Sequence, residues 1–304
     1  MPPKVSLIIP TYNRAHLLPR ALDSALNQDY PALEIIIVDD GSSDNTPEVL
    51  APYLSHPRIR LISHQHNRGV TAAKNTGLDH LPADTVYFGI LDSDDALLPD
   101  AVSKLVQIFE QTNNQYSQVF GWCRDPHSGE ATGIMNKTEG IVHYEDALCG
   151  RFAGEFWQLV SKELLGNMRF EERASGAESS VWWPLMKLKP AYLISDTVRL
   201  YDRSGTDRVN RPVFSGLAAK RKMWVYQAKL NAVGSDMQAL CPQHYAFINL
   251  EKAKWAALAG DRSQTFQAVR EAWLSAPSLR ALKIALMPLM PVSLLRRLYR
   301  HLHA

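Results

Sequence analysis

The chain has 304 residues, 46% of them hydrophobic and 21% charged, and its formal net charge at pH 7 is +2. That length allows a large core with an appended region, and the near-balanced charge argues against a general nucleic-acid-binding protein. The cysteines, Cys123, Cys149 and Cys241, are odd in number and widely spaced. They suggest neither a disulfide framework nor a CxxC zinc site, so a reducing cytoplasm is expected. The first strand begins too early to leave room for a signal peptide, and no apolar run reaches the roughly 18 residues of a membrane span.

Strands and helices are predicted to alternate through the first third of the chain. Residues 5–10 and 34–38 are near-continuous apolar runs, typical of strands covered on both faces of a parallel sheet. Between them, Leu18, Leu22 and Leu26 recur at helical spacing. Further strands are predicted over residues 59–63 and 85–91, and further helices near 46, over 70–81 and from 99 onward. This alternation predicts a βαβ sheet with right-handed crossovers.

Polar segments follow three of the predicted strands, at residues 11–14, 39–43 and 92–95. Ligands of such sheets bind beyond the carboxyl ends of the strands, so these segments should converge. The last one reads Asp-Ser-Asp-Asp, and three carboxylates so close together repel one another unless a cation neutralises them. Hard oxygens suit Mg²⁺ or Mn²⁺, with a substrate phosphate completing the coordination shell. The alternative is a strand-end turn that caps the next helix.

Four sequence blocks, in this order, resemble the inverting family 2 glycosyltransferases of GT-A fold. They are Val5–Arg14, Glu34–Asp44, Asn67–Gly77 and Leu91–Asp95. The resemblance is dense over residues 5–100 and becomes weaker toward residue 203. It implies an α/β, Rossmann-like fold in which a mostly parallel central sheet is flanked by helices, followed by a C-terminal helical extension.

The same resemblance implies roles for the carboxylates. Asp94 is expected to bind Mn²⁺ or Mg²⁺, and Asp92 to face the donor ribose and the metal site. Asp95 is expected to be a helix cap or a supporting partner. Asp40 matches the position that accepts a hydrogen bond from the N3–H of uracil. Asp39 either serves the same base pocket or caps the following turn.

Two further elements of the nucleotide site are implied by the resemblance. Pro10, Thr11, Tyr12 and Asn13 match the loop that packs against the nucleoside. Lys74 corresponds to a basic position near the base and the phosphates, with a solvated helix lysine as the alternative.

Glu178 is the candidate general base. A carboxylate must take the proton of the acceptor hydroxyl as attack proceeds, because that hydroxyl has a pKa far above 7. Residues 175–183 resemble the acidic motif that supplies the base at a helix start, but this chain reads Glu178-Ser179 where the family has an acidic pair. Either Glu178 replaces the usual aspartate, or the site has lost its base, and Glu178 is a first-turn glutamate favoured by the helix dipole. Trp182 is an acceptor platform or a core aromatic.

The last third of the chain is predicted to be helical, over residues 220–230, 246–259 and 262–275. A transferase domain is expected over residues 1–212, with a nucleotide-binding half at 1–115 and an acceptor half at 116–212, followed by a helical extension over 213–304. The apolar run 284–295 is flanked by basic residues, and no acidic residue follows Glu271. This pattern favours a segment lying among anionic lipid headgroups; the alternative is a helix docked on the protein's own core.

These features together predict a cytoplasmic, metal-dependent inverting glycosyltransferase at the inner face of the cell membrane. It would move one sugar from a nucleotide diphosphate sugar, UDP-linked, to a surface-glycan or lipid-linked acceptor with a β-linkage. The Gln-x-x-Arg-Trp motif of processive synthases is absent from the sequence. Arg199, Arg203 and Arg208 would clamp the diphosphate or form a solvated loop. His143 is expected to be a surface histidine or a satisfied core histidine. The main alternative is a catalytically inactive nucleotide-sugar-binding or scaffold protein; a nucleotidyltransferase would open with a Gly-rich phosphate loop, which is missing here.

Overall fold

The computed structural model describes residues 1–202 and 215–301. The described chain forms two compact units. The first comprises Met1–Tyr144, Arg151–Glu172 and the stretch from Pro184 onward, and the second comprises Glu145–Gly150, Arg173–Trp183 and the C-terminal helices. The predicted boundary at residue 212, and the candidate clamp residues Arg203 and Arg208, lie outside the described residues.

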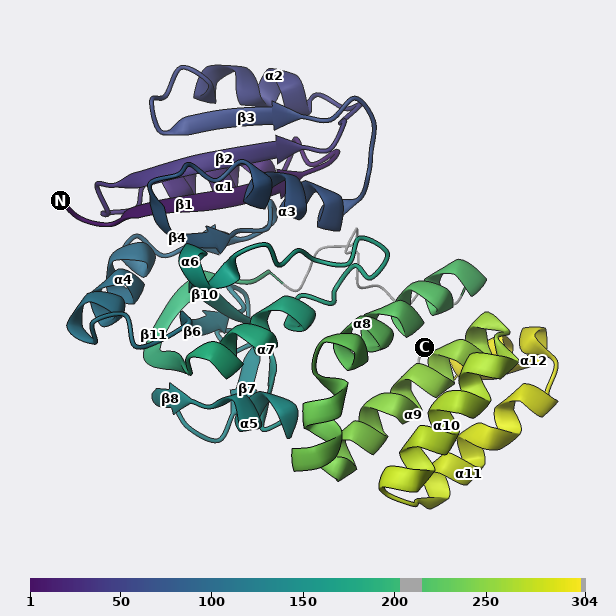
Figure 1. Cartoon of the computed structure of the whole chain (residues 1–304). Coiled ribbons are helices and arrows are strands. Elements are labelled where there is room, and N and C mark those ends of the chain that lie inside the picture. The colour runs from purple at the N-terminus through teal and green to yellow at the C-terminus, as the bar shows by residue number, and fades with distance from the viewer. Residues whose placement is uncertain (203–214, 302–304) are drawn as a thin grey trace. The chain divides into compact units, whose positions relative to one another are not determined.

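A nine-stranded sheet forms the first unit, in the order β3-β2-β1-β4-β10-β6-β11-β5, with β8 paired to β11 (Figure 1). Its N-terminal half is parallel, as predicted, and consists of β1 (Lys4–Thr11), β2 (Leu33–Asp39), β3 (Ile59–Ser63) and β4 (Thr85–Ile90).

The later strands make the sheet mixed. The antiparallel strand β10 (Phe156–Ser161) lies between β4 and β6 (Gln118–Arg124). The next strand, β11 (Ala191–Leu200), runs parallel to β6 and pairs antiparallel with two short strands, β5 (Ala96–Leu97) and β8 (Gly140–Val142). A separate pair is formed by β7 (Gly133–Met135) and β9 (Phe152–Gly154). The predicted α/β class is confirmed.

Helices flank this sheet. The first of them, α1 (Leu18–Leu26), lies where the spacing of Leu18, Leu22 and Leu26 predicts a helix. The buried side chains of α1 are Leu18, Ala21, Leu22 and Ala25, and its proline lies in the first turn, where a missing N–H costs nothing. The other helices of the first unit are α2 (Thr46–Leu50), η1 (Ala51–Tyr53), α3 (Val70–Asp79), α4 (Ala101–Gln111) and α6 (Lys162–Leu165). Most of α5 (Tyr144–Leu148) and the first half of α7 (Ser179–Leu188) belong to the second unit.

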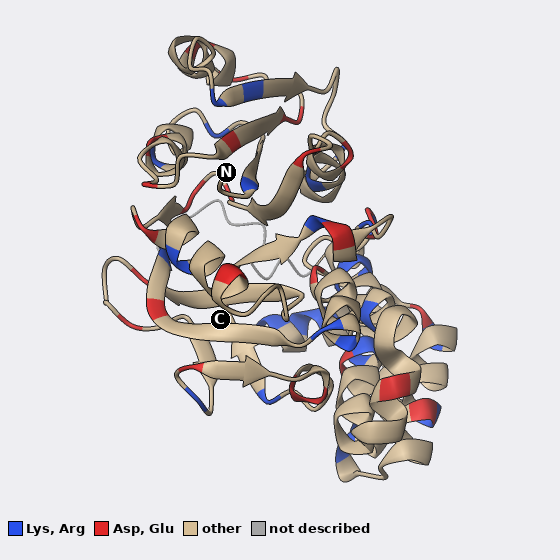
Figure 2. Ribbon diagram, turned by 60° about the vertical axis from the view of Figure 1, so that its left-hand side comes forward, with Lys and Arg blue, Asp and Glu red and all other residues tan. Residues whose placement is uncertain are grey.

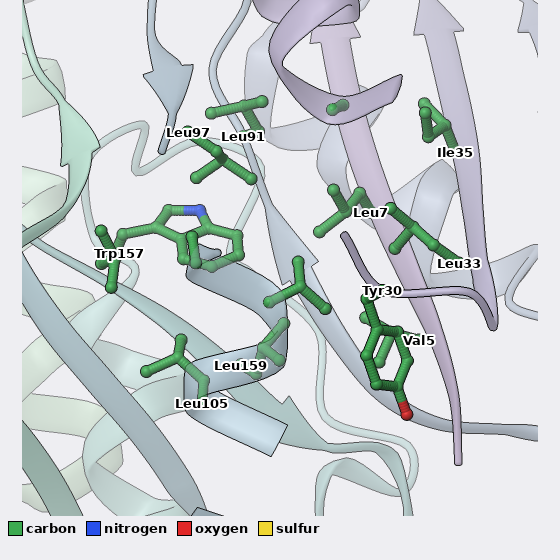
Figure 3. Packing of buried hydrophobic residues seen from close by; sticks show 14 of the residues in the cluster. Val5, Leu7, Tyr30, Leu33, Ile35, Leu91, Leu97, Leu105, Trp157 and Leu159 are labelled. Carbon is green, nitrogen blue, oxygen red and sulfur yellow. The ribbon is translucent and has the colours of Figure 1, made fainter. Parts of the chain in front are cut away.

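The main core fills the space between strands and helices and includes Leu91, Leu105 and Trp157 (Figure 3). Trp157 is 2% exposed, and its indole Nε1–H donates to the carbonyl of Ile90 at 2.9 Å. This hydrogen bond pairs the one polar group of the indole, so Trp157 can be buried without leaving a donor unpaired.

A glycine sets how closely α3 packs on the sheet. A Cβ atom added at Gly77 would collide with the side chain of the fully buried Ile8 on β1. Gly77→Ala is therefore expected to lower the free energy of unfolding by about 1–3 kcal/mol, the usual cost of overpacking a core. Urea denaturation would measure it. Gly234→Ala is the matched control, because a Cβ there meets neighbours only at ordinary contact distance, 3.6 Å or more. Equal stability of the two variants would contradict this packing role.

The second unit is built on α8 (Gly216–Leu240), α9 (Pro242–Ala259), α10 (Arg262–Ser275), α11 (Leu279–Leu286), η2 (Met287–Leu289) and α12 (Val292–His301). Gly260 ends α9 in the left-handed conformation at φ 87°, and the Asp261 carboxylate caps α10 by accepting from Gln264 N–H at 3.0 Å. The predicted break between the second and third helices is therefore confirmed. No helix among residues 1–202 and 215–301 is long and apolar enough to cross a membrane.

The expectation of unpaired cysteines is wrong for two of the three. Cys149 and Cys241 form a disulfide within the second unit, although 92 residues separate them in sequence. Cys123 is free and buried. The sequence did not reveal the pair, because spacing alone does not show which distant cysteines the fold brings together.

Candidate functional site

Three loops converge at the carboxyl ends of β1, β2 and β4, as the sheet topology predicts. In the sheet, β1 lies between β2 and β4. The backbone N–H of Asp40, after β2, donates to the carbonyl of Thr11 at 2.9 Å, and the N–H of Leu91, after β4, donates to that of Ile8 at 2.9 Å. The polar segments 11–14, 39–43 and 92–95 are therefore brought to one edge of the sheet.

Asn13 ties the first two loops together. Its backbone adopts a positive φ of 51°, which asparagine tolerates better than most residues. Its side-chain Oδ1 accepts from the N–H groups of Ser43 at 2.8 Å and Asp44 at 3.3 Å, and its own N–H donates to Ser42 Oγ at 2.9 Å. Asn13 thus joins the loop after β1 to the loop after β2.

The other residues of this loop differ in exposure. Pro10 and Thr11 are buried, and the Thr11 hydroxyl has no hydrogen-bond partner among the described residues. Tyr12 is 41% exposed, so its ring remains accessible to a ligand.

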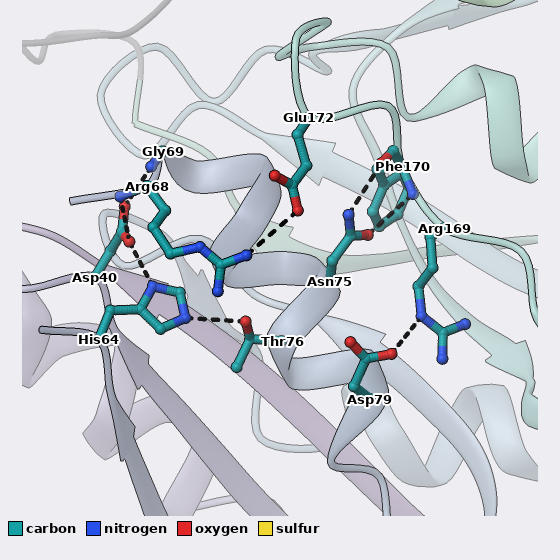
Figure 4. Close-up of polar contacts among 10 residues, drawn as sticks. All are labelled: Asp40, His64, Arg68, Gly69, Asn75, Thr76, Asp79, Arg169, Phe170 and Glu172. Atoms are coloured by element: carbon teal, nitrogen blue, oxygen red, sulfur yellow. Dashed lines mark hydrogen bonds and ion pairs between the residues drawn. The ribbon is translucent and has the colours of Figure 1, made fainter. Parts of the chain in front are cut away.

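The two aspartates after β2 have different partners. Asp39 Oδ1 accepts from Ser42 N–H at 3.0 Å and from its hydroxyl at 2.6 Å, so this side chain caps the turn. Asp40 is 1% exposed, and its Oδ1 faces His64 Nδ1 at 2.6 Å and Arg68 N–H at 2.9 Å (Figure 4). Its Oδ2 accepts from Gly69 N–H at 2.7 Å. A carboxylate has about four acceptor sites, so one at Oδ2 remains for a further donor.

His64 is a site residue that the sequence reasoning missed. Its Nε2 lies 2.9 Å from the Thr76 hydroxyl, while Nδ1 faces Asp40 (Figure 4). Nδ1–H donates to the Asp40 carboxylate, whereas the Thr76 hydroxyl can pair with Nε2 either as donor or as acceptor. The available signal was a histidine directly after a predicted strand.

Three consecutive residues of α3 connect separate parts of the first unit. Thr76 contacts His64, and Asn75 exchanges two hydrogen bonds of 2.9 Å with the backbone of Phe170 (Figure 4). Lys74 lies 3.4 Å from Asp92 Oδ1, and its side chain is 9% exposed. The alternative of a solvated lysine is therefore wrong. Through Lys74 and Thr76, α3 connects the loops that follow β2, β3 and β4.

Asp92 remains a charged group despite its surroundings. Burial acts to raise the pKa of this carboxyl group. The positive charges of Lys74 and Arg199 outweigh burial and lower the pKa below its usual value. An ionised carboxylate facing a lysine is a suitable ligand for a cation or a hydroxyl group.

Asp95 is buried and pairs with Arg199 of β11. It is 1% exposed, and its Oδ2 lies 3.0 Å from a guanidinium nitrogen of Arg199. Burial, together with the charges of Asp92 and Asp94, raises the pKa of Asp95 to about 8 against the opposing effect of Arg199. The structure thus favours the role of supporting partner that the sequence left open.

Arg199 is neither a diphosphate clamp nor part of a solvated loop. It is 4% exposed and also contacts Glu155 Oε2 at 3.1 Å and Cys123 Sγ at 3.2 Å. The buried guanidinium group of Arg199 stabilises the acidic loop through its ion pair with Asp95. Both sequence-based readings of Arg199 are therefore corrected.

The acidic loop fits a metal held jointly with a substrate. The described residues contain no group of three or more His, Cys, Asp or Glu side chains that could hold a metal ion by themselves. Asp92 and Asp94 are both partly exposed, and the Asp94 carbonyl accepts from Arg20 at 2.9 Å. Mg²⁺ sites with substrate phosphates commonly use one or two carboxylates. These two aspartates match that donor set.

Glu178 lies in the second unit, directly before α7. Its carbonyl accepts from the N–H groups of Val181 at 3.0 Å and Trp182 at 3.1 Å, which confirms the predicted helix start. The side chain is partly exposed, and its role as the base stays a prediction. His143 is exposed, which is one of the two alternatives expected for it.

Known proteins resemble this chain in sequence and in fold. The model of Glycosyl transferase family 2 matches residues 6–158, half of the chain. The GalNAc(5)-diNAcBac-PP-undecaprenol beta-1,3-glucosyltransferase of Campylobacter jejuni is 38% identical over 205 residues, 66% of this chain and 64% of the relative. The chondroitin synthase of Escherichia coli is 44% identical over 110 residues, 36% of this chain and 16% of the relative. The chain thus spans less than two thirds of either relative.

Two solved structures bear on the fold. S. aureus TarS 1-349 in complex with UDP-GlcNAc has a TM-score of 0.69 at 16% identity, over 98% of this chain and 92% of TarS. The mannosyltransferase PcManGT from Pyrobaculum calidifontis, in complex with GDP-Man and Mn²⁺, has a TM-score of 0.60 at 22% identity, over 93% and 78% of the two chains. The predicted GT-A fold with C-terminal helices is confirmed by these likenesses. With the family model matching its N-terminal half, this chain belongs to glycosyl transferase family 2.

Proposed function

We propose that this protein is a metal-dependent inverting glycosyltransferase that moves one sugar from a UDP-sugar to an acceptor hydroxyl and forms a β-linkage. The observation that carries the proposal is the convergence, at one edge of the sheet, of a nucleotide loop, a pair of aspartates and an acidic loop joined by Lys74 to α3. Ligands of parallel sheets bind at this edge. An edge rich in oxygen ligands, with a lysine beside them, suits a nucleoside diphosphate.

The donor would be held by groups whose chemistry matches its parts. The remaining acceptor site of Asp40 is suited to the N3–H of uracil, which a cytosine ring lacks. Asp39 shapes the turn beside it, and the exposed ring of Tyr12 is available to stack on the base. Lys74 would balance the charge of the diphosphate, and Asp92 would face the ribose and the metal.

Transfer needs the bond between the sugar and the diphosphate to break. Asp94 and Asp92 would hold Mn²⁺ or Mg²⁺, which neutralises the charge that builds on the leaving diphosphate. Glu178 would take the proton of the acceptor hydroxyl while that oxygen attacks the anomeric carbon from the opposite face. Attack from that side inverts the anomeric centre, so an α-linked donor sugar gives a β-linked product.

The acceptor is proposed from the relatives. One is named for a sugar chain on PP-undecaprenol, another for chondroitin, so we propose a lipid-linked or polysaccharide acceptor. The corresponding location is the cytoplasmic side of the membrane. In that reducing compartment the Cys149–Cys241 disulfide would be reduced to two thiols.

A nucleotide panel tests the donor site. UDP-sugars with Mn²⁺ are expected to raise the melting temperature of the protein, and a chelator should remove most of that shift because the metal and diphosphate bind together.

Asp40→Ala should weaken UDP binding by about 1–3 kcal/mol, the cost of losing a charged hydrogen-bond partner. Calorimetry would measure it, with the exposed Asp29→Ala as control. Unchanged UDP affinity would remove Asp40 from the base pocket.

A second function rests on one departure from the family motif. Ser179 stands where the acidic pair has its second carboxylate, and a site without a base would bind nucleotide sugars without transferring them. Donor hydrolysis or transfer to any acceptor would exclude this inactive binding or scaffold protein.

A further inference from the structure

The segment formed by α11 and η2 has two opposite apolar faces. On one face, Ala281 and Ile284 are 0% and 6% exposed and pack into a cluster with side chains of α9 and α10. Pro288 of η2 is also buried. The expected alternative of a helix docked on its own core is therefore correct for this face, and the apolar run 284–295 is not free as a whole.

The other face is exposed and equally apolar. Leu279, Leu282, Leu286 and Leu289 are 77%, 49%, 61% and 72% exposed. Their spacing of three and four residues places them in one stripe along the helix, opposite Ala281 and Ile284. We call these four leucines the α11 stripe. Leucines so exposed and so regularly spaced indicate a surface that meets an apolar partner.

The segment after Glu271 carries only basic charges, although Arg280 is paired with Glu251 of α9. No aspartate or glutamate follows Glu271, whereas the basic residues after it are Arg280, Lys283, Arg296, Arg297 and Arg300. Lys283 is exposed and stands between two leucines of the stripe. On α12, the exposed Arg297 stands between Leu294 and Leu298, which are 43% and 45% exposed. Figure 2 colours Lys and Arg blue and Asp and Glu red along the ribbon.

We infer that the α11 stripe inserts into the headgroup region of an anionic lipid bilayer, with Lys283 and Arg297 against the lipid phosphates. Apolar side chains interleaved with basic ones are typical of segments that lie in this region, and each basic residue near an anionic surface contributes about 1 kcal/mol. A second copy is disfavoured as the occupant, because it would bring the two basic surfaces together. The inference rests on the proposed function in one respect: a lipid-linked acceptor would itself lie in the bilayer.

Vesicle sedimentation with the full chain tests the inference. The protein is expected to sediment with phosphatidylglycerol-containing vesicles at low salt, to bind pure phosphatidylcholine weakly, and to be released by high salt. Leu282→Ser with Leu286→Ser should weaken the partition about tenfold or more, because two inserted side chains are lost. The matched control is Leu217→Ser with Leu240→Ser, two leucines of α8 that are 58% and 55% exposed. Lys283→Glu should weaken binding to anionic vesicles only.

Three results would overturn the inference. They are a wild-type protein that ignores anionic vesicles at low salt, a stripe variant that binds as tightly as the control, and a stripe variant that turns a stable dimer into a monomer in light scattering without lipid. Thermal unfolding of each variant checks that it is folded. Donor hydrolysis is measured in parallel: if the wild type binds vesicles but neither hydrolyses nor transfers sugar, the proposed function fails while the membrane surface stands.

Discussion

Asp94→Asn is expected to abolish sugar transfer, lowering kcat by about 10³-fold or more, while the melting temperature stays close to that of the wild type. The substitution removes the charge of a proposed metal ligand, so charge on the leaving diphosphate would be poorly neutralised. A loss of 10³ corresponds to about 4 kcal/mol of transition-state stabilisation. Fold and core are spared because Asp94 is partly exposed and fills no cavity.

The assay is run on chelator-treated protein restored with Mn²⁺. Asp100→Asn is the control, because Asp100 is a nearby aspartate, 44% exposed, that pairs with Lys104 on the same helix turn. Its activity should match that of the wild type. Full activity of Asp94→Asn after metal restoration would rule out Asp94 as the ligand, and Asp92 would be tested next.

Glu178→Gln is expected to slow transfer by about 10²–10⁴-fold, the usual contribution of a general base. Donor affinity should be unchanged, because the variant keeps the shape of the side chain and the base acts on the acceptor. Glu178→Asp should keep more activity than Glu178→Gln, because it retains a carboxylate. Single-turnover kinetics would separate this chemical defect from a defect in binding.

Neighbouring glutamates test whether the base lies elsewhere. Glu171→Gln and Glu172→Gln serve as controls. If the rate of Glu178→Gln barely falls and one of these collapses, the base lies on the segment before Ser175.

The sequence by itself determined the elements and the edge at which they meet. Apolar runs specify β1 and β2 as strands covered on both faces, and the leucine spacing specifies the buried side of α1, because each depends on residues close together in the chain. Once strands alternate with helices, right-handed crossovers place all strand ends on one edge. The convergence of Thr11, Asp40 and Asp92 could therefore be predicted without coordinates.

Only the tertiary structure decided which side chains share that edge as partners. His64 meets Asp40, Asn75 meets the Phe170 backbone 95 residues away, and Arg199 supports Asp95 from β11. These contacts depend on the order of strands in the sheet, including the insertion of β10 between β4 and β6. The two faces of α11 were equally undecided, because a leucine and an isoleucine look alike in a hydrophobic pattern until packing buries one of them. Local patterns fix which residues are apolar or charged, whereas long-range packing chooses the partner of each.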